Sequence, residues 1–307
     1  MRTVCVVVNW NGGDENLECV QSLLDQGSSP TDIVFVDNGS SDGSLESVRQ
    51  RFPELTYLCN EENLGFGDGS NQGARLALER GADAVFFVNN DVALPKGVLA
   101  RLESELESNP SCGIVGPRVL FKHDERRIWA AGGTLTWRQN VTTLRGNGQL
   151  DGEAWRSVQD VDYVPGCALL ARRDVFERVG FFDGDYFAYM EDVDLCLMAR
   201  KEGFGVRLCG DVHVLHAASS ATGGGYSARR KYMNGVNSVW FLRKHAGFAQ
   251  WASFLLFDVL SLPFVWLVAL PRGRSKAVLA KALGILHGIL GRRVSGDVVQ
   301  PGASRFW

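Results

Sequence analysis

Asp91 is one candidate for a chemical role. It follows Asn89 and Asn90 at the end of the most hydrophobic strand-like run, Ala84 to Val88. Hard cations take oxygen ligands and leave coordination positions for phosphate, so an aspartate at the mouth of a buried sheet is suited to hold Mg²⁺ or Mn²⁺ against a diphosphate. The alternative is a loop aspartate that caps the helix expected after Pro95.

Glu191-Asp192-Val193-Asp194 is a second candidate, because it opens a predicted helix directly after the aromatic residues Tyr186, Phe187 and Tyr189. Carboxylates within one helical turn repel one another, and the helix N-terminus offsets part of this repulsion. Nearby aromatic rings raise a carboxyl pKa toward the range useful to a general base. Ordinary charge complementation of a helix N-terminus is the alternative.

His216 is a third candidate. It follows the strand-like run Val206 to Leu215 and precedes a loop of small residues, Ala217 to Gly225. A histidine that leaves a strand end for such a loop is poorly placed for burial, and its imidazole could ligate a metal. Metal ligation and a structural role both remain open on residue type alone.

Short β-branched runs alternate with helix-like segments in the first third of the chain, which predicts a mostly parallel sheet covered by helices. The pattern expects Asp42 or Ser41 to cap the helix Ser44 to Arg51, and Pro95 to begin the helix that reaches Glu107. The expected strand–helix pairs are Thr3 to Val8 with Glu15 to Asp25, Ile33 to Val36 with Ser44 to Arg51, and Ala84 to Val88 with Lys96 to Glu107.

The middle of the chain, roughly Cys112 to Arg172, is richer in strand signals, which predicts antiparallel strands beside the parallel sheet. A short helix is expected after Asp174, and a further helix over Glu191 to Glu202. Polar residues follow two of the parallel strands, where open α/β sheets gather ligands.

The C-terminal part of the chain differs in charge and hydropathy. Net charge is only −3, yet Asp258 is the sole acidic residue from Val212 to Gly296, a stretch with many Lys and Arg residues. The glycines Gly223 to Gly225 mark a boundary between a domain over residues 1–222 and a helical region over 223–307. Phe248 to Leu270 is almost wholly apolar and contains Pro263, so we expect an interfacial or hairpin membrane anchor; plain packing on the first domain is the alternative.

Cysteine usage and the N-terminus bear on location. Seven single cysteines without a C-x-x-C pair favour a reducing compartment, and most, such as Cys5, Cys59, Cys167 and Cys209, fall in apolar runs where a thiol packs as a small hydrophobe. The first apolar run reaches Asn9 almost at once, so no signal peptide is expected. These features predict a cytoplasmic protein, peripheral on or anchored in the inner face of the cell membrane.

Seven short motifs, taken in order, resemble the family 2 glycosyltransferases of the GT-A (nucleotide-diphospho-sugar transferase) fold, most of all bacterial rhamnosyltransferases of surface polysaccharide synthesis. The resemblance covers about Thr3 to Ser220, and Asn89 stands where the family's D-x-D triplet has its first acid. The motifs are Val8-Asn9-Trp10-Asn11, Val36-Asp37-Asn38-Gly39-Ser40, Asn63-x-Gly65-Phe66, Asn71-x-Gly73, Asn89-Asn90-Asp91, Gly180-Phe181-Phe182-Asp183 and Glu191-Asp192-Val193-Asp194.

The resemblance implies an inverting transfer of a sugar from a nucleotide-diphosphate donor, dTDP-rhamnose or a UDP-sugar, to a glycan or lipid-linked glycan. It implies that Asp192 is the general base and that Asp91 and His216 hold a divalent cation, Mg²⁺ or Mn²⁺. The donor-side residues it implies are Asn9, Asn11, Asp37, Asn63, Gly65, Asn71, Asn90 and Asp91. We expect Glu191, Tyr189 and Trp129 on the acceptor side.

Two other functions remain as alternatives. Gly65-x-Gly67-x-Gly69 suggests a dinucleotide-dependent oxidoreductase, but position 70 is Ser and the cluster follows the third strand rather than the first. A catalytically inactive carbohydrate-binding module on the same fold is disfavoured because Asp91, Asp192 and His216 are all present. The long apolar runs of the basic tail favour a membrane surface over a phosphate backbone, so no nucleic-acid partner is expected.

Overall fold

The computed structural model describes residues 1–138, 140–218, 226–300 and 302–307. The chain forms two compact units. The first unit comprises Met1–Thr134, Leu144–Asp183 and Asp192–Ala218; the second comprises Leu135–Thr143, Gly184–Glu191 and Ser219–Trp307. The predicted boundary glycines, Gly223 to Gly225, lie outside the described residues, so the division at residue 222 stays a prediction.

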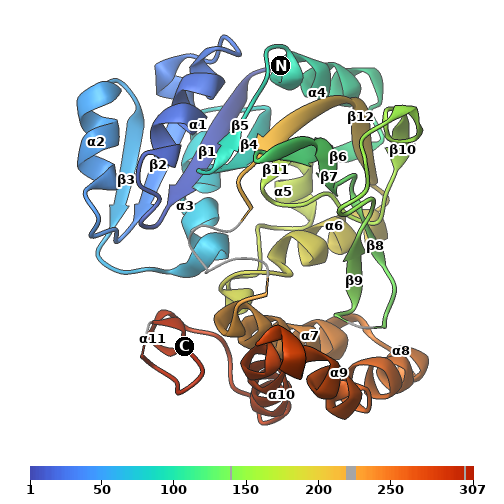
Figure 1. Ribbon diagram of the computed structural model, residues 1–307. Coiled ribbons are helices and arrows are strands. Elements are labelled where there is room, and N and C mark those ends of the chain that lie inside the picture. The colour runs from blue at the N-terminus through green and yellow to red at the C-terminus, as the bar shows by residue number, and fades with distance from the viewer. Residues whose placement is uncertain (139, 219–225, 301) are drawn as a thin grey trace. The chain divides into compact units, whose positions relative to one another are not determined.

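A mixed sheet forms the centre of the first unit (Figure 1). Among the described residues its strand order is β10-β12-β6-β11-β4-β1-β2-β3, with β5 beside β12 and β7 beside β6. The strands are β1 Thr3–Asn9, β2 Ile33–Asn38, β3 Thr56–Asn60, β4 Ala84–Asn89, β5 Val92–Ala93, β6 Cys112–Phe121, β7 Asp124–Ala130, β10 Val158–Asp160, β11 Ala168–Arg172 and β12 Gly205–His216; β8 Gly133–Leu135 and β9 Thr142–Leu144 pair separately.

The first half of the sheet is parallel and the middle section adds antiparallel strands, as the sequence predicts. β1 pairs in parallel with both β2 and β4, whereas β11 runs antiparallel to β4 and to β6. One pair in the second half, β6 with β12, is again parallel. The predicted α/β class with a mixed sheet is therefore confirmed.

Helices cover both faces of this sheet. Cys5 and Val7 of β1 belong to a buried cluster with residues of α1, α2 and α4, while Val6 points to the opposite face. There α3 packs closely, because a Cβ added at Gly73 would lie 2.5 Å from Val6 Cγ1. The helices are α1 Glu15–Leu24, α2 Ser44–Arg51, α3 Gly65–Glu79, α4 Val98–Ser108, α5 Arg173–Arg178 and α6 Glu191–Lys201, with the short helices η1 Pro30–Asp32, η2 Glu153–Trp155 and η3 Gly184–Tyr186.

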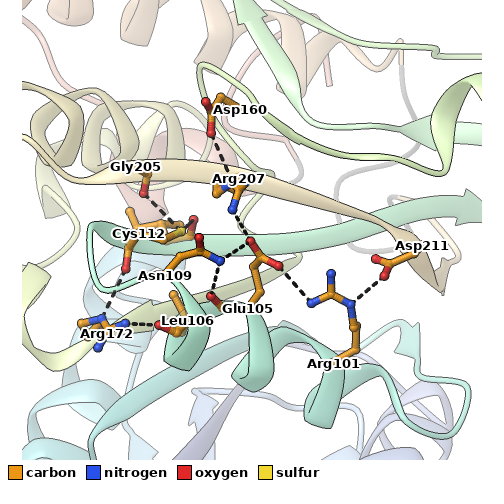
Figure 2. A network of polar contacts seen from close by, with 11 residues as sticks. Arg101, Glu105, Leu106, Asn109, Cys112, Asp160, Arg172, Gly205, Arg207 and Asp211 are labelled. Carbon is orange, nitrogen blue, oxygen red and sulfur yellow. Dashed lines mark hydrogen bonds and ion pairs between the residues drawn. The ribbon is translucent and has the colours of Figure 1, made fainter.

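Glu105 connects α4 to the sheet through a closed polar network (Figure 2). Its buried carboxylate accepts hydrogen bonds from Asn109 Nδ2 at 2.9 Å and Arg101 Nη1 at 3.1 Å, and a further one from Arg207 of β12. Arg207 Nε lies 3.3 Å from Asp160 of β10. A buried carboxylate that is multiply paired in this way fixes the helix without an unsatisfied charge.

The second unit is helical, which confirms the predicted helical C-terminal region. α7 and α10 pack closely because glycines face one another: a Cβ added at Gly284 would lie 2.2 Å from the Tyr232 carbonyl oxygen. The helices are α7 Ala228–His245, α8 Phe248–Phe254, the π-helical η4 Leu255–Val259, α9 Leu262–Ala269, η5 Leu270–Arg272, α10 Ser275–Ile289 and α11 Gly296–Val299.

A buried ion pair lies inside the second unit. Asp258 and Lys281 are 1% and 5% exposed, and the Lys281 ammonium donates to Asp258 Oδ1. Lys281 also donates to Asn140 Oδ1 at 2.8 Å, and the Asn140 backbone N–H donates to Asp258 Oδ2 at 3.0 Å. Each charged group therefore has more than one partner.

Local details differ from the sequence predictions at three positions. Pro95 does not begin a helix: α4 starts at Val98, after Gly97 turns the chain with a φ of 85°. Gly43 is the N-cap of α2, although Asp42 Oδ1 still accepts the Ser44 N–H at 3.0 Å. Cys59 is exposed because β3 is an edge strand of the sheet, unlike the other six cysteines.

Candidate active site

Asn9 organises the carboxyl ends of the parallel strands. Its side chain is fully buried, and Nδ2 donates to Asp37 Oδ1 and to Ser44 Oγ, each at 2.8 Å. Its Oδ1 accepts from Asn16 at 2.9 Å and from Asn90 at 3.1 Å. Both ends of the amide are engaged within the protein, so Asn9 holds the neighbouring loops, and its contact with the nucleotide stays a prediction.

The loops after β1 and β2 hold one another. Asn11 has a left-handed backbone with a φ of 53°, and its Oδ1 accepts the Ser41 N–H at 2.8 Å. In return, Ser40 Oγ accepts the Asn11 N–H at 3.0 Å, and Asp37 Oδ2 accepts the Ser40 N–H at 3.0 Å. Asn11 and Ser41 are the exposed members of this set, and the contact of Asn11 with a nucleotide stays a prediction.

The segment from Asn63 to Asn71 is fixed from two sides. Asn63 Oδ1 accepts the Gly65 N–H at 2.9 Å, and the buried Asn38 donates to the Gly65 carbonyl at 2.8 Å. Asn71 pairs in both directions with the backbone of Phe182, donating at 2.8 Å and accepting at 3.0 Å. Asn71 therefore ties α3 to the segment before α6, a role that the sequence does not reveal.

Asp91 and His216 come together at the end of the sheet. β5 pairs with β12 so that Val92 lies opposite His216, and His216 Nε2 is 3.1 Å from Asp91 Oδ1. Both side chains are buried, and the Trp129 ring meets the imidazole edge-on at 4.6 Å between centroids. Trp129 thus lies beside this pair, and its predicted contact with an acceptor stays a prediction.

His216 Nδ1 is a buried nitrogen with no hydrogen-bond partner among the described residues. A buried unpaired polar atom is unfavourable by about 1–3 kcal/mol, so it indicates a group that a ligand satisfies. One carboxylate and one imidazole suit a divalent cation. No cluster of three or more His, Cys, Asp or Glu side chains suited to a metal occurs in the described part of the chain, so a bound cation would take further ligands from the substrate.

Asp192 lies in the first turn of α6 and is held by backbone donors. Its Oδ2 accepts the Gly166 N–H at 2.8 Å, and its Oδ1 accepts the Val193 N–H at 2.8 Å. Burial raises the pKa of Asp192, although these two hydrogen bonds act in the opposite direction. A carboxylate with a raised pKa and a fixed orientation is suited to accept a proton.

Gly166 is a site residue that the sequence analysis missed. A Cβ added there would lie 3.2 Å from Asp192 Cβ and 3.4 Å from the Phe66 ring, so a side chain would press on the carboxylate. The available signal was the Pro165-Gly166 pair, which interrupts the apolar run from Val161 to Ala171.

Cys167 connects the two acidic candidates. Burial, followed by the negative charges of Asp91 and Asp192, raises the pKa of its thiol. Its carbonyl accepts the Asn89 N–H at 3.0 Å, next to the Asn90-Asp91 pair. Because the neighbouring Gly166 N–H bonds to Asp192, the backbone of Gly166 and Cys167 links the segments of the two acids, which are 101 positions apart in the sequence.

The acceptor-side candidates Tyr189 and Glu191 belong to the second unit. Arg230 stacks over the Tyr189 ring with its guanidinium carbon 5.0 Å from the centroid, and Glu191 is 6% exposed. Phe187, Tyr189 and Met190 have φ angles of 62°, 72° and 82°, a left-handed conformation that is unfavourable for residues with a side chain. Contacts of Tyr189 and Glu191 with an acceptor stay predictions.

A mixed sheet in this order, with amide and acidic side chains at the carboxyl ends of β1, β2 and β4, is the architecture of a GT-A glycosyltransferase. The model of the family described as glycosyl transferase family 2 matches residues 4–180. The chain belongs to glycosyl transferase family 2.

Relatives and solved structures agree with this family. The chain is 28% identical over 242 residues to an N-acetylglucosaminyl-diphospho-decaprenol L-rhamnosyltransferase of Mycobacterium tuberculosis, covering 71% of this chain and 76% of the relative. It is 24% identical to the low-salt glycan biosynthesis hexosyltransferase Agl10 of Haloferax volcanii, covering 94% and 91%. The mannosyltransferase PcManGT from Pyrobaculum calidifontis, solved with GDP-Man and Mn²⁺, has a TM-score of 0.58 at 16% identity and covers 95% of this chain and 88% of that one.

The resemblance to rhamnosyltransferases is thus confirmed, and the chain is an enzyme that transfers a sugar. The oxidoreductase alternative is wrong. Gly65, Gly67 and Gly69 lie within α3 itself and do not form a loop at the end of β1, and Gly69 packs against Asn38 and Val8. That position cannot serve as a dinucleotide phosphate loop.

Proposed function

We propose that this enzyme moves a sugar from a nucleotide-diphosphate donor to a hydroxyl group with inversion at the anomeric carbon. The observation that carries the proposal is the segment Gly166-Cys167, whose backbone bonds to Asp192 and to Asn89, two residues before Asp91. Asp91 in turn lies 3.1 Å from His216. The side chains of Asp91 and His216 suit the charged leaving group, and that of Asp192 suits the incoming nucleophile. An inverting displacement needs these two functions on opposite sides of the reacting carbon.

Asp192 accepts the proton of the acceptor hydroxyl as the new glycosidic bond forms and the bond to the diphosphate breaks. The N–H groups of Gly166 and Val193 hold its two oxygens, so the carboxylate keeps one orientation while it works. Asn11 and the loops fixed by Asn9 and Asp37 orient the nucleotide. A divalent cation, Mg²⁺ or Mn²⁺, held by Asp91 and His216 would stabilise the negative charge of the departing diphosphate.

The donor that we propose is dTDP-rhamnose, with UDP-sugars as the next class, and the acceptor is a glycan or lipid-linked glycan of cell-envelope polysaccharide. The mycobacterial relative supports this choice, because its name gives rhamnose as the transferred sugar and a decaprenol-linked sugar as the acceptor.

A membrane surface is the partner that we propose for the second unit, on the cytoplasmic side of the cell membrane. The segment Phe248–Arg272 is long and apolar enough to cross a bilayer, and only 17% of its most apolar window is buried within the protein. Its exposed side chains include Phe248, Leu260 and Phe264 at 91%, 70% and 71% exposure. The surrounding excess of Lys and Arg suits anionic lipid head groups.

We propose that this segment lies in the interface and does not span the bilayer. Asp258, near its middle, is paired with Lys281 of α10, and a spanning arrangement would bring this ion pair into hydrocarbon. The helix is also interrupted, since η4 is π-helical and α9 begins only at Leu262. Broken amphipathic helices with exposed aromatic residues are typical of interfacial anchors.

The enzymatic proposal is tested with purified protein, a panel of dTDP- and UDP-sugars, and membrane lipid extract, with and without Mn²⁺ or Mg²⁺. Release of nucleoside diphosphate is measured for the wild type and for Asp192→Asn. We expect metal-dependent release from one donor and its loss in the variant. Equal activity of the two proteins would contradict the role of Asp192.

The membrane proposal is tested by flotation of the protein with phosphatidylcholine vesicles that contain or lack phosphatidylglycerol. We expect flotation with the anionic vesicles and its loss in a Leu260→Ser, Phe264→Ser double variant. Failure of the wild type to float with either vesicle would overturn the proposal.

A further inference from the structure

One buried amide in the second unit holds the loop that leads into the catalytic helix. Asn237 of α7 is fully buried, and its Nδ2 donates to the carbonyl oxygens of Tyr186 at 2.9 Å, Ala188 at 2.8 Å and Tyr189 at 2.8 Å. Three carbonyl oxygens can surround only the donor end of an amide, which fixes the orientation of this side chain. One NH₂ group therefore binds three of four consecutive peptide units.

The loop that Asn237 binds has an unfavourable backbone. Phe187, Tyr189 and Met190 are all left-handed, with φ angles from 62° to 82°, and none of them is glycine. Such conformations persist only where surrounding contacts impose them, and they gather at functional sites. The Phe187 side chain is buried against Tyr232 and Val236 of α7, so packing and hydrogen bonds act from the same helix.

The loop continues directly into α6, the helix that carries Asp192. η3 ends at Tyr186, the left-handed residues follow, and α6 begins at Glu191, one residue before Asp192. The path of residues 187–190 therefore sets where the first turn of α6 starts and how its first carboxylates are directed.

We propose that Asn237 is a positioning residue for the general base: by holding the carbonyls of Tyr186, Ala188 and Tyr189, it keeps the loop in the left-handed path that presents Asp192 to the acceptor hydroxyl. This inference rests on the proposed function for the identity of the base. Asn237 touches no substrate in this account and acts through the loop.

The test compares four variants of α7 with the wild type. Asn237→Asp keeps the size of the side chain and removes both N–H donors, and Asn237→Ala removes the whole amide. Asn234→Ala makes the same change at a half-buried asparagine of the same helix, and Val239→Ala creates a cavity at a fully buried position of that helix. Measured quantities are kcat with the active donor of the panel, the Kd of UDP and dTDP, and hydrogen–deuterium exchange over residues 184–191.

We expect kcat to fall about 100-fold in both Asn237 variants, because a displacement of about 1 Å at a catalytic group has an effect of that size. The Kd of the nucleotide should stay within about twofold, since the base does not bind it, and exchange over residues 184–191 should rise. Asn234→Ala and Val239→Ala should retain kcat within a few-fold.

Several results would overturn the inference. Wild-type kcat in the Asn237 variants would do so, as would an equal loss of kcat in Val239→Ala, which would indicate general damage to the helix. If the wild type transfers no sugar at all, the proposed function fails. The exchange measurement still tests whether Asn237 holds the loop, because unchanged exchange over residues 184–191 in Asn237→Asp would show that it does not.

Discussion

Asp91 with His216 in the first unit, and Asp258 with Lys281 in the second, are both buried pairs of an acid and a nitrogen base. The second pair is closed, because Asn140 and Lys281 supply donors to both carboxylate oxygens of Asp258. The first pair leaves His216 Nδ1 without a hydrogen-bond partner among the described residues. We propose that the closed pair serves stability and that the incomplete pair serves a ligand.

The largest effect is expected from breaking the incomplete pair. Asp91→Asn and His216→Ala should each reduce sugar transfer by about 1000-fold, since electrostatic stabilisation of the leaving group is lost. The free energy of unfolding of His216→Ala should fall modestly, because the substitution removes a buried ring that contacts Asp91 and Trp129, although it also removes an unsatisfied nitrogen. Steady-state kinetics and urea denaturation measure the two quantities, and retained activity in His216→Ala would refute the ligand role.

The closed pair should show the opposite behaviour. Asp258→Ala should lower the free energy of unfolding by about 3–5 kcal/mol, because Lys281 is left buried without its counter-charge. Asp258→Leu combined with Lys281→Met should recover most of that loss. Urea denaturation of the single and double variants checks this, and an undiminished stability of Asp258→Ala would show that the pair is not closed in solution.

Asp192 gives a prediction on pH. Its folded-state pKa is raised, so kcat/KM should rise with pH through a pKa above that of an ordinary aspartate. The thiols of Cys167 and Cys196 also face it, but burial raises their pKa values, so both are neutral over this range. An acid limb at the pKa of an exposed aspartate would contradict the assignment.

The raised pKa of Asp192 also makes the free energy of unfolding depend on pH. A folded-state pKa above the unfolded one means that the ionised carboxylate disfavours folding at neutral pH, and that this penalty disappears as the pH falls through the two pKa values. The free energy of unfolding of Asp192→Asn relative to the wild type should therefore increase as the pH rises from the pKa of an unfolded aspartate to 7. A loss that does not depend on pH offsets this gain, because the Asn amide can accept only one of the two backbone N–H bonds. Thermal unfolding at several pH values measures the difference.

Gly166→Ala is expected to have a smaller effect on sugar transfer than Asp91→Asn or His216→Ala. A methyl group 3.2 Å from Asp192 Cβ should shift the carboxylate by a few tenths of an ångström and reduce kcat about tenfold. Gly152→Ala, at a position where an added Cβ meets no atom within 4 Å, is the matched control. Equal kinetics for the two variants would show that Asp192 tolerates a closer neighbour.

Much of the first unit could be predicted from the sequence, because its strands are continuous β-branched runs and its helices have a clear apolar periodicity. The strands around Val6, Val34 and Val85 follow from this pattern, whereas the joint roles of Asp91, His216 and Asp192 follow from the resemblance to the family. The hydrogen bonds of Asn9, Asn71 and Gly166 could not be predicted. They join segments far apart in the chain, and an asparagine or glycine has the same local signature whether it binds a ligand or another loop.

The error at Pro95 has a related cause. Proline at the first position of a helix is a sound local rule, but Gly97 turns the chain with a positive φ, and α4 begins after it. The exposed Cys59 shows a similar limit, because an edge strand and a central strand have similar composition. Local patterns identify the elements, whereas pairing order decides which of them are covered.

The most direct test of the account is titration of Mn²⁺ into the protein in the presence of UDP or dTDP, followed by calorimetry. The wild type and the Asp258→Leu, Lys281→Met double variant should bind the cation with similar affinity once the nucleotide is present. His216→Ala should bind it at least about tenfold more weakly. If His216→Ala binds Mn²⁺ as the wild type does, the incomplete pair is not the metal site, and the comparison between the two pairs is wrong.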